Sequence, residues 1–223
     1  MAQPPMLAVA HRAGNDAAAL RAALDAGVDL VEADIHLFRG ALEVRHRKAI
    51  GRHLFWEKWC DISWRRDIIL PELADVLAQV RDGVNREPRL MLDLKGPALA
   101  VAPQVAATLR AAVPGMPVSV CTKQWRMLDA FDADPHVRRI LSASNPVQLR
   151  RLLARLRRRR AAGVSVRHQL LTPAIAEELR RGADVVMVWP VDTEAALDHV
   201  RWLGVSGVIS KNLAMLRQLV TAR

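Results

Sequence analysis

Short apolar runs alternate with longer amphipathic segments along almost the whole of this 223-residue sequence. The runs are rich in Val, Ile, Leu and Met, and most of them are bounded by Gly or Pro. This composition is typical of parallel strands that are buried on both faces. We predict strands at residues 6–10, 29–35, 89–94, 116–121, 137–141, 163–168, 184–189 and 206–210.

The segments between these runs carry apolar residues three and four positions apart, as amphipathic helices do. Several begin with Pro or with a residue that commonly caps helices. The predicted helices cover residues 16–26, 71–80, 98–113, 124–131, 146–160, 173–181, 193–203 and 213–221.

Eight strand–helix units predict a (β/α)8 TIM barrel, with residues 1–223 as a single domain. A doubly wound open sheet is the alternative, but such a sheet usually has a Gly-rich phosphate loop after its first strand. Here that strand is followed by His11-Arg12-Ala13-Gly14, which is not such a loop. Residues 36–70 interrupt the alternation, and we interpret them as a small insertion after strand 2, on the face where barrels carry their active sites.

The formal net charge of +10 comes mainly from arginine and admits several partners: nucleic acid, an anionic membrane or a phosphorylated substrate. The most basic segment, RLLARLRRRR at 151–160, has leucines at helical spacing and no interleaved aromatics for base stacking. We interpret it as the solvated face of an outer helix and predict no nucleic-acid partner.

The two cysteines, Cys60 and Cys121, lie far apart and do not indicate a disulfide framework. The first residues carry no basic stretch ahead of an apolar run, and no run is long enough to span a membrane. We therefore expect a cytoplasmic protein. The sequence does not indicate an oligomeric state.

Polar residues at the ends of the predicted strands are candidates for a functional site. Glu32 and Asp34 are two apart on the second strand, so both point to one face, which should be the barrel interior. Asp93 and Lys95 repeat that spacing on the third strand. The other candidates are His11 and Arg12 after the first strand, His46 after the strand-like 41–45, and Trp189 at the end of the seventh.

Three carboxylates in a barrel mouth repel one another unless a cation holds them. Oxygen ligands without a nearby thiolate favour Mg²⁺ or Ca²⁺ over zinc. Two histidines beside such an ion could act as general acid and base, and Arg and Lys nearby favour a phosphate-bearing substrate. The alternative is a buried network in which these charges only pair with one another.

Seven segments, taken in order, resemble the glycerophosphodiester phosphodiesterase family. They are AHRAGN, LVEADIHL, VRH, ILPELADVL, LMLDLKG, VVMVWPVDT and GVSGVIS, and they span the chain from His11 to about Val208. Each motif is weak alone, and the ordered set is what resembles the family, as a divergent member.

The resemblance implies metal-dependent hydrolysis of glycerophosphodiesters to glycerol 3-phosphate and an alcohol. It implies an acid–base pair of His11 and His46, with the metal, Mg²⁺ or Ca²⁺, held by Glu32, Asp34 and Asp93. It also implies that Arg12, Lys95 and Trp189 contact a small-molecule substrate, a phosphodiester or a lysophospholipid.

The sequence departs from the family pattern around these positions. Ala13 stands where the family has Gly, and Gly14-Asn15-Asp16 replaces its Glu-Asn-Thr. Three further pairs depart from the family pattern. The second residue differs in His46-Arg47 and Trp189-Pro190, and both residues differ in Ser210-Lys211. Arg47 and Lys211 add positive charge. A catalytically weak barrel that binds phosphorylated metabolites or anionic partners is therefore the alternative function.

Three tryptophans of the insertion, Trp56, Trp59 and Trp64, admit two interpretations. They could contact lipid, which would give the protein a peripheral membrane contact, or they could anchor the insertion onto the barrel.

Overall fold

The computed structural model describes residues 5–51, 53–56, 61–64, 70–82 and 89–223. Cys60, Trp59 and the remaining residues of the insertion at 52, 57–60 and 65–69 lie outside this description.

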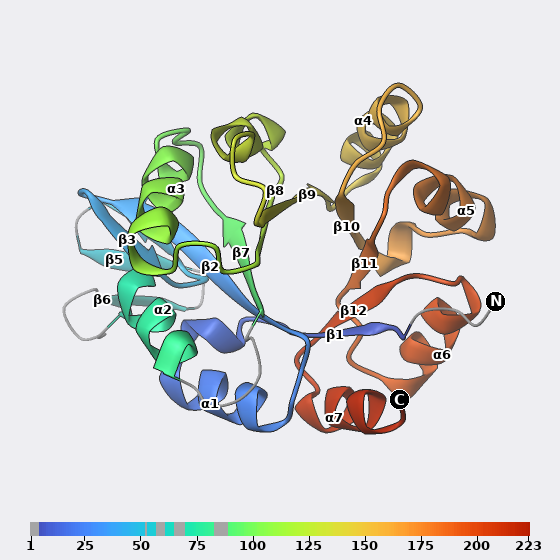
Figure 1. Cartoon of the computed structure of the whole chain (residues 1–223), viewed down its shortest axis with the longest axis horizontal. Helices are drawn as coiled ribbons and strands as arrows, with labels where there is room; N and C mark the ends of the chain where they lie inside the picture. The colour runs from blue at the N-terminus through green and yellow to red at the C-terminus, as the bar shows by residue number, and fades with distance from the viewer. Residues whose placement is uncertain (1–4, 52, 57–60, 65–69, 83–88) are drawn as a thin grey trace.

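Eight parallel strands close into a barrel (Figure 1). The barrel strands, in the order in which they neighbour one another, are β1 (Leu7–Ala10), β2 (Leu30–Phe38), β7 (Arg89–Leu94), β8 (Val118–Thr122), β9 (Val137–Ala143), β10 (Gly163–Arg167), β11 (Val186–Trp189) and β12 (Gly207–Ser210). The first strand pairs with both β2 and β12, which closes the ring. The TIM barrel prediction is confirmed, and each barrel strand overlaps a predicted run.

Helices lie outside the ring and follow the strands in alternation (Figure 1). They are α1 (Ala17–Asp25), α2 (Leu73–Asp82), α3 (Val101–Ala112), α4 (Pro146–Leu156), α5 (Pro173–Gly182), α6 (Glu194–Trp202) and α7 (Leu213–Thr221), with short 3-10 turns η1 (Ala13–Asn15), η3 (Trp125–Phe131) and η4 (His168–Leu170). Asp16, Asn145, Thr172, Thr193 and Asn212 cap the helices that follow them, as their side chains accept from backbone N–H groups of the first turn.

Two predicted helices differ from the structure. The helix predicted at 124–131 is the 3-10 helix η3 (Trp125–Phe131), whose first residue is tied to β9 by a 3.0 Å hydrogen bond from the Trp125 indole Nε1 to the carbonyl of Ser142. The helix predicted to reach residue 160 ends at Leu156. Arg160 instead bonds Asp184 and the carbonyl of Arg181, which ties the chain to the end of α5.

The insertion begins with the strand-like segment 41–45, which forms a strand, and continues with three short strands that the sequence did not predict. A turn at Arg39-Gly40, where both residues have positive φ (52° and 87°), connects β2 to β3 (Ala41–Val44), which pairs antiparallel with β2 outside the ring. Beyond it, β4 (Lys48–Ile50), β5 (Leu54–Trp56) and β6 (Ile62–Trp64) form a separate three-stranded antiparallel sheet. These strands are too short, and too dense in charge and aromatics, to show a clear period.

Alternation along the strands divides the core into two parts. One part fills the inside of the barrel and contains Val9, Leu30, Met91, Cys121, Ile140, Met187 and Ile209. Neighbouring positions on the same strands, such as Ala8, Leu90 and Val208, belong to the larger part between the barrel and its helices. The side chains two residues after these inward-facing positions also point inward. They lie at the end of the barrel where all eight strands finish. We call this end the mouth.

Candidate functional site

Three buried or half-buried carboxylates meet at the mouth. Glu32 and Asp34 share a face of β2, and Asp34 lies directly opposite Asp93 in the register between β2 and β7. Each of the three offers an oxygen, and these oxygens all lie within 4.8 Å of one another. Strand alternation and register together therefore place the predicted carboxylates in one cluster.

The segment after β1 lies against this cluster. Arg12 has a left-handed backbone (φ 59°), which is uncommon outside glycine, and its N–H donates to Glu32 Oε2 at 2.5 Å. Gly14 is buried two residues on, and a Cβ built on it would lie 2.7 Å from Ala33 Cβ and 3.2 Å from the Glu32 carbonyl. The backbone therefore approaches β2 closely at Gly14, the residue after Ala13.

Replacing Gly14 with alanine is expected to lower the free energy of unfolding by about 1–3 kcal/mol, the usual cost of overpacking. The added methyl group meets β2 between Glu32 and Asp34, so η1 must move away from the carboxylates. Urea denaturation measures the loss. Gly40→Ala, where a Cβ meets nothing within 4 Å but the φ is 87°, tests strain without crowding. A Gly14→Ala protein of wild-type stability would contradict the packing argument.

Asp34 is the most highly bonded member of the cluster. Its Oδ2 accepts from Asn15 Nδ2 at 2.8 Å and lies 3.0 Å from His46 Nδ1, and its Oδ1 lies 2.8 Å from Lys95 Nζ. Burial alone would raise the pKa of Asp34, but the hydrogen bond with His46 and the charge of Lys95 bring that pKa below its usual range. Asp34 is therefore ionised at neutral pH.

His46 reaches the cluster because β3 runs back along β2. The Arg45 N–H donates to the Asp34 carbonyl at 2.9 Å, which brings the next residue level with the mouth. Arg12 Nη2 lies 2.5 Å from His46 Nε2. A guanidinium can only donate, so Nε2 accepts and Nδ1 carries the proton that it donates to Asp34.

Asp93 and Glu32 are less favourably placed for negative charge. Burial first, and then the neighbouring Asp34, raise the pKa of Glu32 well above its usual value. Burial also raises the pKa of Asp93, although the Lys95 ammonium pairs with it. The same carboxylates raise the pKa of Lys95 despite its own burial. Lys95 therefore stays charged and partly neutralises the cluster.

His11 follows β1 and is largely buried. Its Nδ1 is buried and has no hydrogen-bond partner within the described chain. Burial first, and then the charge of Arg12, lower the pKa of His11 to about 4. The imidazole is therefore neutral at pH 7 and can accept a proton.

This shift predicts a pH dependence of stability. Between pH 6.5 and about 4, the unfolded chain binds a proton at His11 that the folded protein does not. The free energy of unfolding, measured in a chelator, should therefore decrease as the pH falls through this window. His11→Gln is expected to make the decrease shallower, and denaturation at several pH values tests it. An unchanged slope would show that His11 titrates normally in the folded state.

The other predicted site residue, Trp189, ends β11 and is half-buried, with Lys123 Nζ 5.5 Å from the centre of its ring. Of the two extra positive charges, Arg47 is paired with Asp61 (2.9 Å) and donates to Ser63 Oγ, so its charge is balanced within the insertion. Lys211 follows β12 and is exposed.

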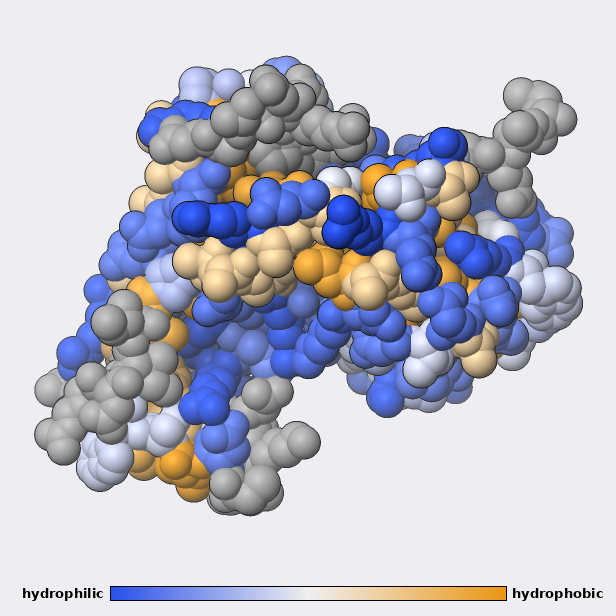
Figure 2. Space-filling model, turned by 90° about the horizontal axis from the view of Figure 1, so that it is seen from below, coloured by the Kyte–Doolittle hydropathy of each residue, from blue (hydrophilic) through white to orange (hydrophobic). Residues whose placement is uncertain are grey.

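The insertion lies to one side of the mouth. In the view from below, a hydrophilic hollow separates a projecting lobe on the left from the rest of the barrel (Figure 2). Figure 1 places β3, β5 and β6 on that side. Phe55 is buried with the Arg45 guanidinium over its ring, Trp56 is half-buried with Lys48 over its ring, and Trp64 is 52% exposed. The first two favour anchoring of the insertion.

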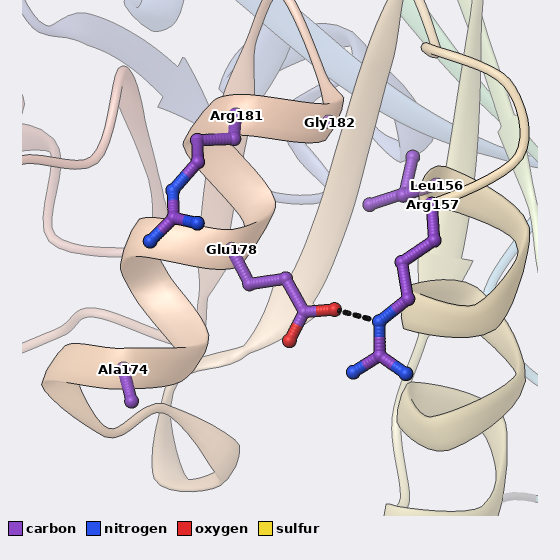
Figure 3. Close-up of a pocket in the computed structure, with 6 residues that line it drawn as sticks. All are labelled: Leu156, Arg157, Ala174, Glu178, Arg181 and Gly182. Carbon is purple, nitrogen blue, oxygen red and sulfur yellow. Dashed lines mark hydrogen bonds and ion pairs between the residues drawn. The ribbon is translucent and has the colours of Figure 1, made fainter.

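The arginine-rich segment lies far from this site along the barrel wall. Figure 3 shows the groove between α4 and α5, where Arg157 Nε donates to Glu178 at 2.6 Å. Arg160 pairs with Asp184, and Arg181 pairs with Glu177. Arg157 and Arg160 link neighbouring segments, and Arg181 pairs within α5, which favours the interpretation of a solvated outer face.

Two polar contacts of the site were not predicted. Asn15 both donates to the Asp34 carboxylate and accepts from its N–H at 2.8 Å. Cys121 lies opposite Asp93 in the register and hydrogen-bonds that carboxylate. In the sequence, the only indication of the Asn15 contact was its position, four residues after His11 on a shortened loop.

The fold and the site define a (β/α)8 barrel whose mouth carries a carboxylate cluster, two histidines and an arginine. Three solved structures with this fold cover nearly the whole chain. A glycerophosphodiester phosphodiesterase from Thermotoga maritima is similar over 99% of this chain and 100% of its own, with 17% identity and a TM-score of 0.74. One from Parabacteroides distasonis covers 100% and 99%, with 17% identity and a TM-score of 0.74.

The third is an Oleispira antarctica phosphodiesterase in complex with the product sn-glycerol-3-phosphate. It covers 98% of this chain and 97% of its own, with 15% identity and a TM-score of 0.69. At these identities the likeness is one of fold. No protein-family model matches the sequence, and no curated protein matches it. Among the described residues, none of the helices has the length and apolar character needed to cross a membrane.

Proposed function

We propose that this protein hydrolyses glycerophosphodiesters to glycerol 3-phosphate and an alcohol. The observation that carries the proposal is the meeting of His11, His46 and Arg12 around the carboxylates of Glu32, Asp34 and Asp93 at the mouth. The shared fold of solved phosphodiesterases, one of them bound to glycerol 3-phosphate, supports the reaction class.

The carboxylate cluster fits a divalent cation. Its donors are all hard oxygens, they lie within 4.8 Å of one another, and burial with like charge raises the pKa of Glu32. A cation there would relieve that repulsion. Glu32, Asp34 and Asp93 would hold Mg²⁺ or Ca²⁺, which when bound supplies Lewis-acid stabilisation of negative charge.

The protein's own side chains divide the proton transfers. His11, kept neutral by its surroundings, takes the proton from the neighbouring glycerol hydroxyl, which attacks phosphorus and forms a cyclic phosphate as the bond to the leaving alcohol breaks. Water then opens the cyclic phosphate to give glycerol 3-phosphate. His46 is oriented by the contact between its Nδ1 and Asp34, and it supplies a proton to the leaving oxygen from Nε2. That role requires Arg12 to turn from Nε2 toward the phosphate, where Arg12 and Lys95 neutralise the non-bridging oxygens. Trp189 contacts the substrate.

The test is incubation with glycerophosphocholine, glycerophosphoethanolamine and a lysophospholipid, each with Mg²⁺, Ca²⁺ or EDTA. We expect release of glycerol 3-phosphate, or of lysophosphatidic acid from the lysophospholipid, that requires the metal. Binding of phosphorylated ligands without turnover of any substrate would instead support the catalytically weak binding protein. Retained turnover in EDTA would contradict a metal at the cluster.

A further inference from the structure

The mouth is divided into an acidic half and a basic half. Alternation places residues at the strand ends in the inward-pointing set that includes Met91, Cys121, Met187 and Ile209 lower in the barrel. On β2 and β7 the inward positions at the mouth are acidic, with Lys95 beyond them. The corresponding positions on or after β8, β10, β11 and β12 are Lys123, Arg167, Trp189 and Lys211.

Lys123 extends across the mouth. It follows β8, and yet its ammonium lies 5.5 Å from the ring centre of Trp189 on β11, with β9 and β10 between these two strands in the ring. Burial first, and then the charge of Lys95, lower the pKa of Lys123. No described carboxylate forms an ion pair with it, and its side chain contacts the aromatic face of Trp189, although Asp93 and Asp34 act on its charge from further away.

Lys211 directly follows β12, which pairs with β11, the strand that ends at Trp189. Its backbone N–H donates to Asp192 Oδ1 at 2.8 Å, and the same oxygen accepts from Ser210 Oγ at 3.0 Å. Val188 pairs with Val208 in the register, so Lys211 lies beyond the strand end that adjoins Trp189. Its charge is close enough to contribute to lowering the pKa of His11. Within the described chain its ammonium is in no ion pair.

We propose that Lys123 and Lys211, with Trp189 between them, form an anion subsite for a second phosphate on the substrate. The substrate class is a glycerophosphodiester whose alcohol moiety carries a phosphate monoester. A phosphodiester has one negative charge, which Arg12 and Lys95 on the acidic half can neutralise. Two ammonium groups on the basic half match the additional dianion. This inference rests on the proposed hydrolysis at the same mouth.

The test compares two substrates that differ by one phosphate: glycerophosphoglycerol, and glycerophosphoglycerol with a terminal phosphate. We expect wild-type kcat/KM to be about tenfold higher for the phosphorylated compound, the effect of one favourable charged contact. Lys123→Met and Lys211→Met should each reduce this ratio about three- to tenfold, as partly exposed ion pairs do. Lys123→Arg and Lys211→Arg should largely keep it, and high salt should weaken it. Arg159→Met, exposed after α4, is the matched control and should leave the ratio unchanged.

Calorimetry on the His11→Ala variant measures binding of the same two compounds without dependence on turnover. If both diesters are hydrolysed with equal kcat/KM, or if the preference survives both Met variants, the subsite is refuted and the proposed function stands. If neither diester is hydrolysed but the phosphorylated compound binds more tightly through the two lysines, the proposed reaction fails and the subsite stands. Equal binding of both compounds would also refute the subsite.

Discussion

Replacing His11 with alanine is expected to lower kcat for glycerophosphodiesters by about 10²–10⁴-fold, the usual contribution of a positioned general base. The reason is that His11 is the imidazole whose surroundings keep it neutral, with a pKa of about 4, beside the carboxylate cluster. The Arg12–His46 contact and the cluster itself do not depend on the His11 side chain. Binding of the metal should therefore persist while turnover is lost. Initial-rate kinetics with saturating Mg²⁺ or Ca²⁺ measure the effect.

The matched control is His136→Ala. His136 is exposed and its carbonyl accepts from Val118 at the start of β8, so it lies at the opposite end of the barrel. Its removal should change kcat by less than about twofold, within the range of a neutral surface substitution. If His11→Ala keeps wild-type kcat at an unchanged melting temperature, His11 is not the base.

Replacing Asp34 with alanine is expected to destabilise the protein by about 3–5 kcal/mol, the usual cost of breaking a buried ion pair. Asp34 is 1% exposed, forms an ion pair with Lys95, and is hydrogen-bonded to His46 and Asn15. Its lowered pKa means that these contacts more than offset the burial of its charge. Urea denaturation in EDTA measures the loss. The variant should also lose any stabilisation by Mg²⁺ or Ca²⁺, which differential scanning fluorimetry records.

Two comparisons make this prediction specific. Asp184→Ala removes an exposed ion pair with Arg160 and should cost no more than about 1 kcal/mol. Glu32→Gln removes a carboxylate whose pKa is raised, so in EDTA it should not destabilise the protein, although it should abolish the metal effect. An Asp34→Ala protein as stable as Asp184→Ala would show that the network contributes little.

The sequence predicted the barrel because its strands are local patterns. Runs such as LMLDL at β7 and VVMVW around β11 are largely apolar on both faces and are bounded by residues that end strands. Each run therefore indicates a buried strand from its own residues, without knowledge of the strands beside it. Helix starts were also local, since Asn145-Pro146 and Thr172-Pro173 carry both a cap and a proline. The insertion gave no such pattern, and its small sheet went unpredicted.

For the candidate site, too, the sequence predicted the features that depend on local patterns and not those that depend on distant residues. Strand alternation alone put Glu32, Asp34 and Asp93 on inward faces, and the structure places their oxygens together. The sequence could not give the partners of these groups. That Arg12 lies against His46, or that Arg47 is neutralised by Asp61, depends on the path of β3 and of the chain beyond it.

The sequence by itself therefore determined the order of strands and helices, the inward direction of the carboxylates and the position of each candidate residue at a strand end. The tertiary structure alone decided the contacts of each group and the directions in which the pKa values of His11, Glu32 and Asp34 shift. Lys123 reaching Trp189 across the ring is the clearest case. The physical reason is that a repeating pattern needs only a residue and its near neighbours in the chain. Charge, burial and hydrogen bonding depend on groups brought together from distant strands when the barrel closes.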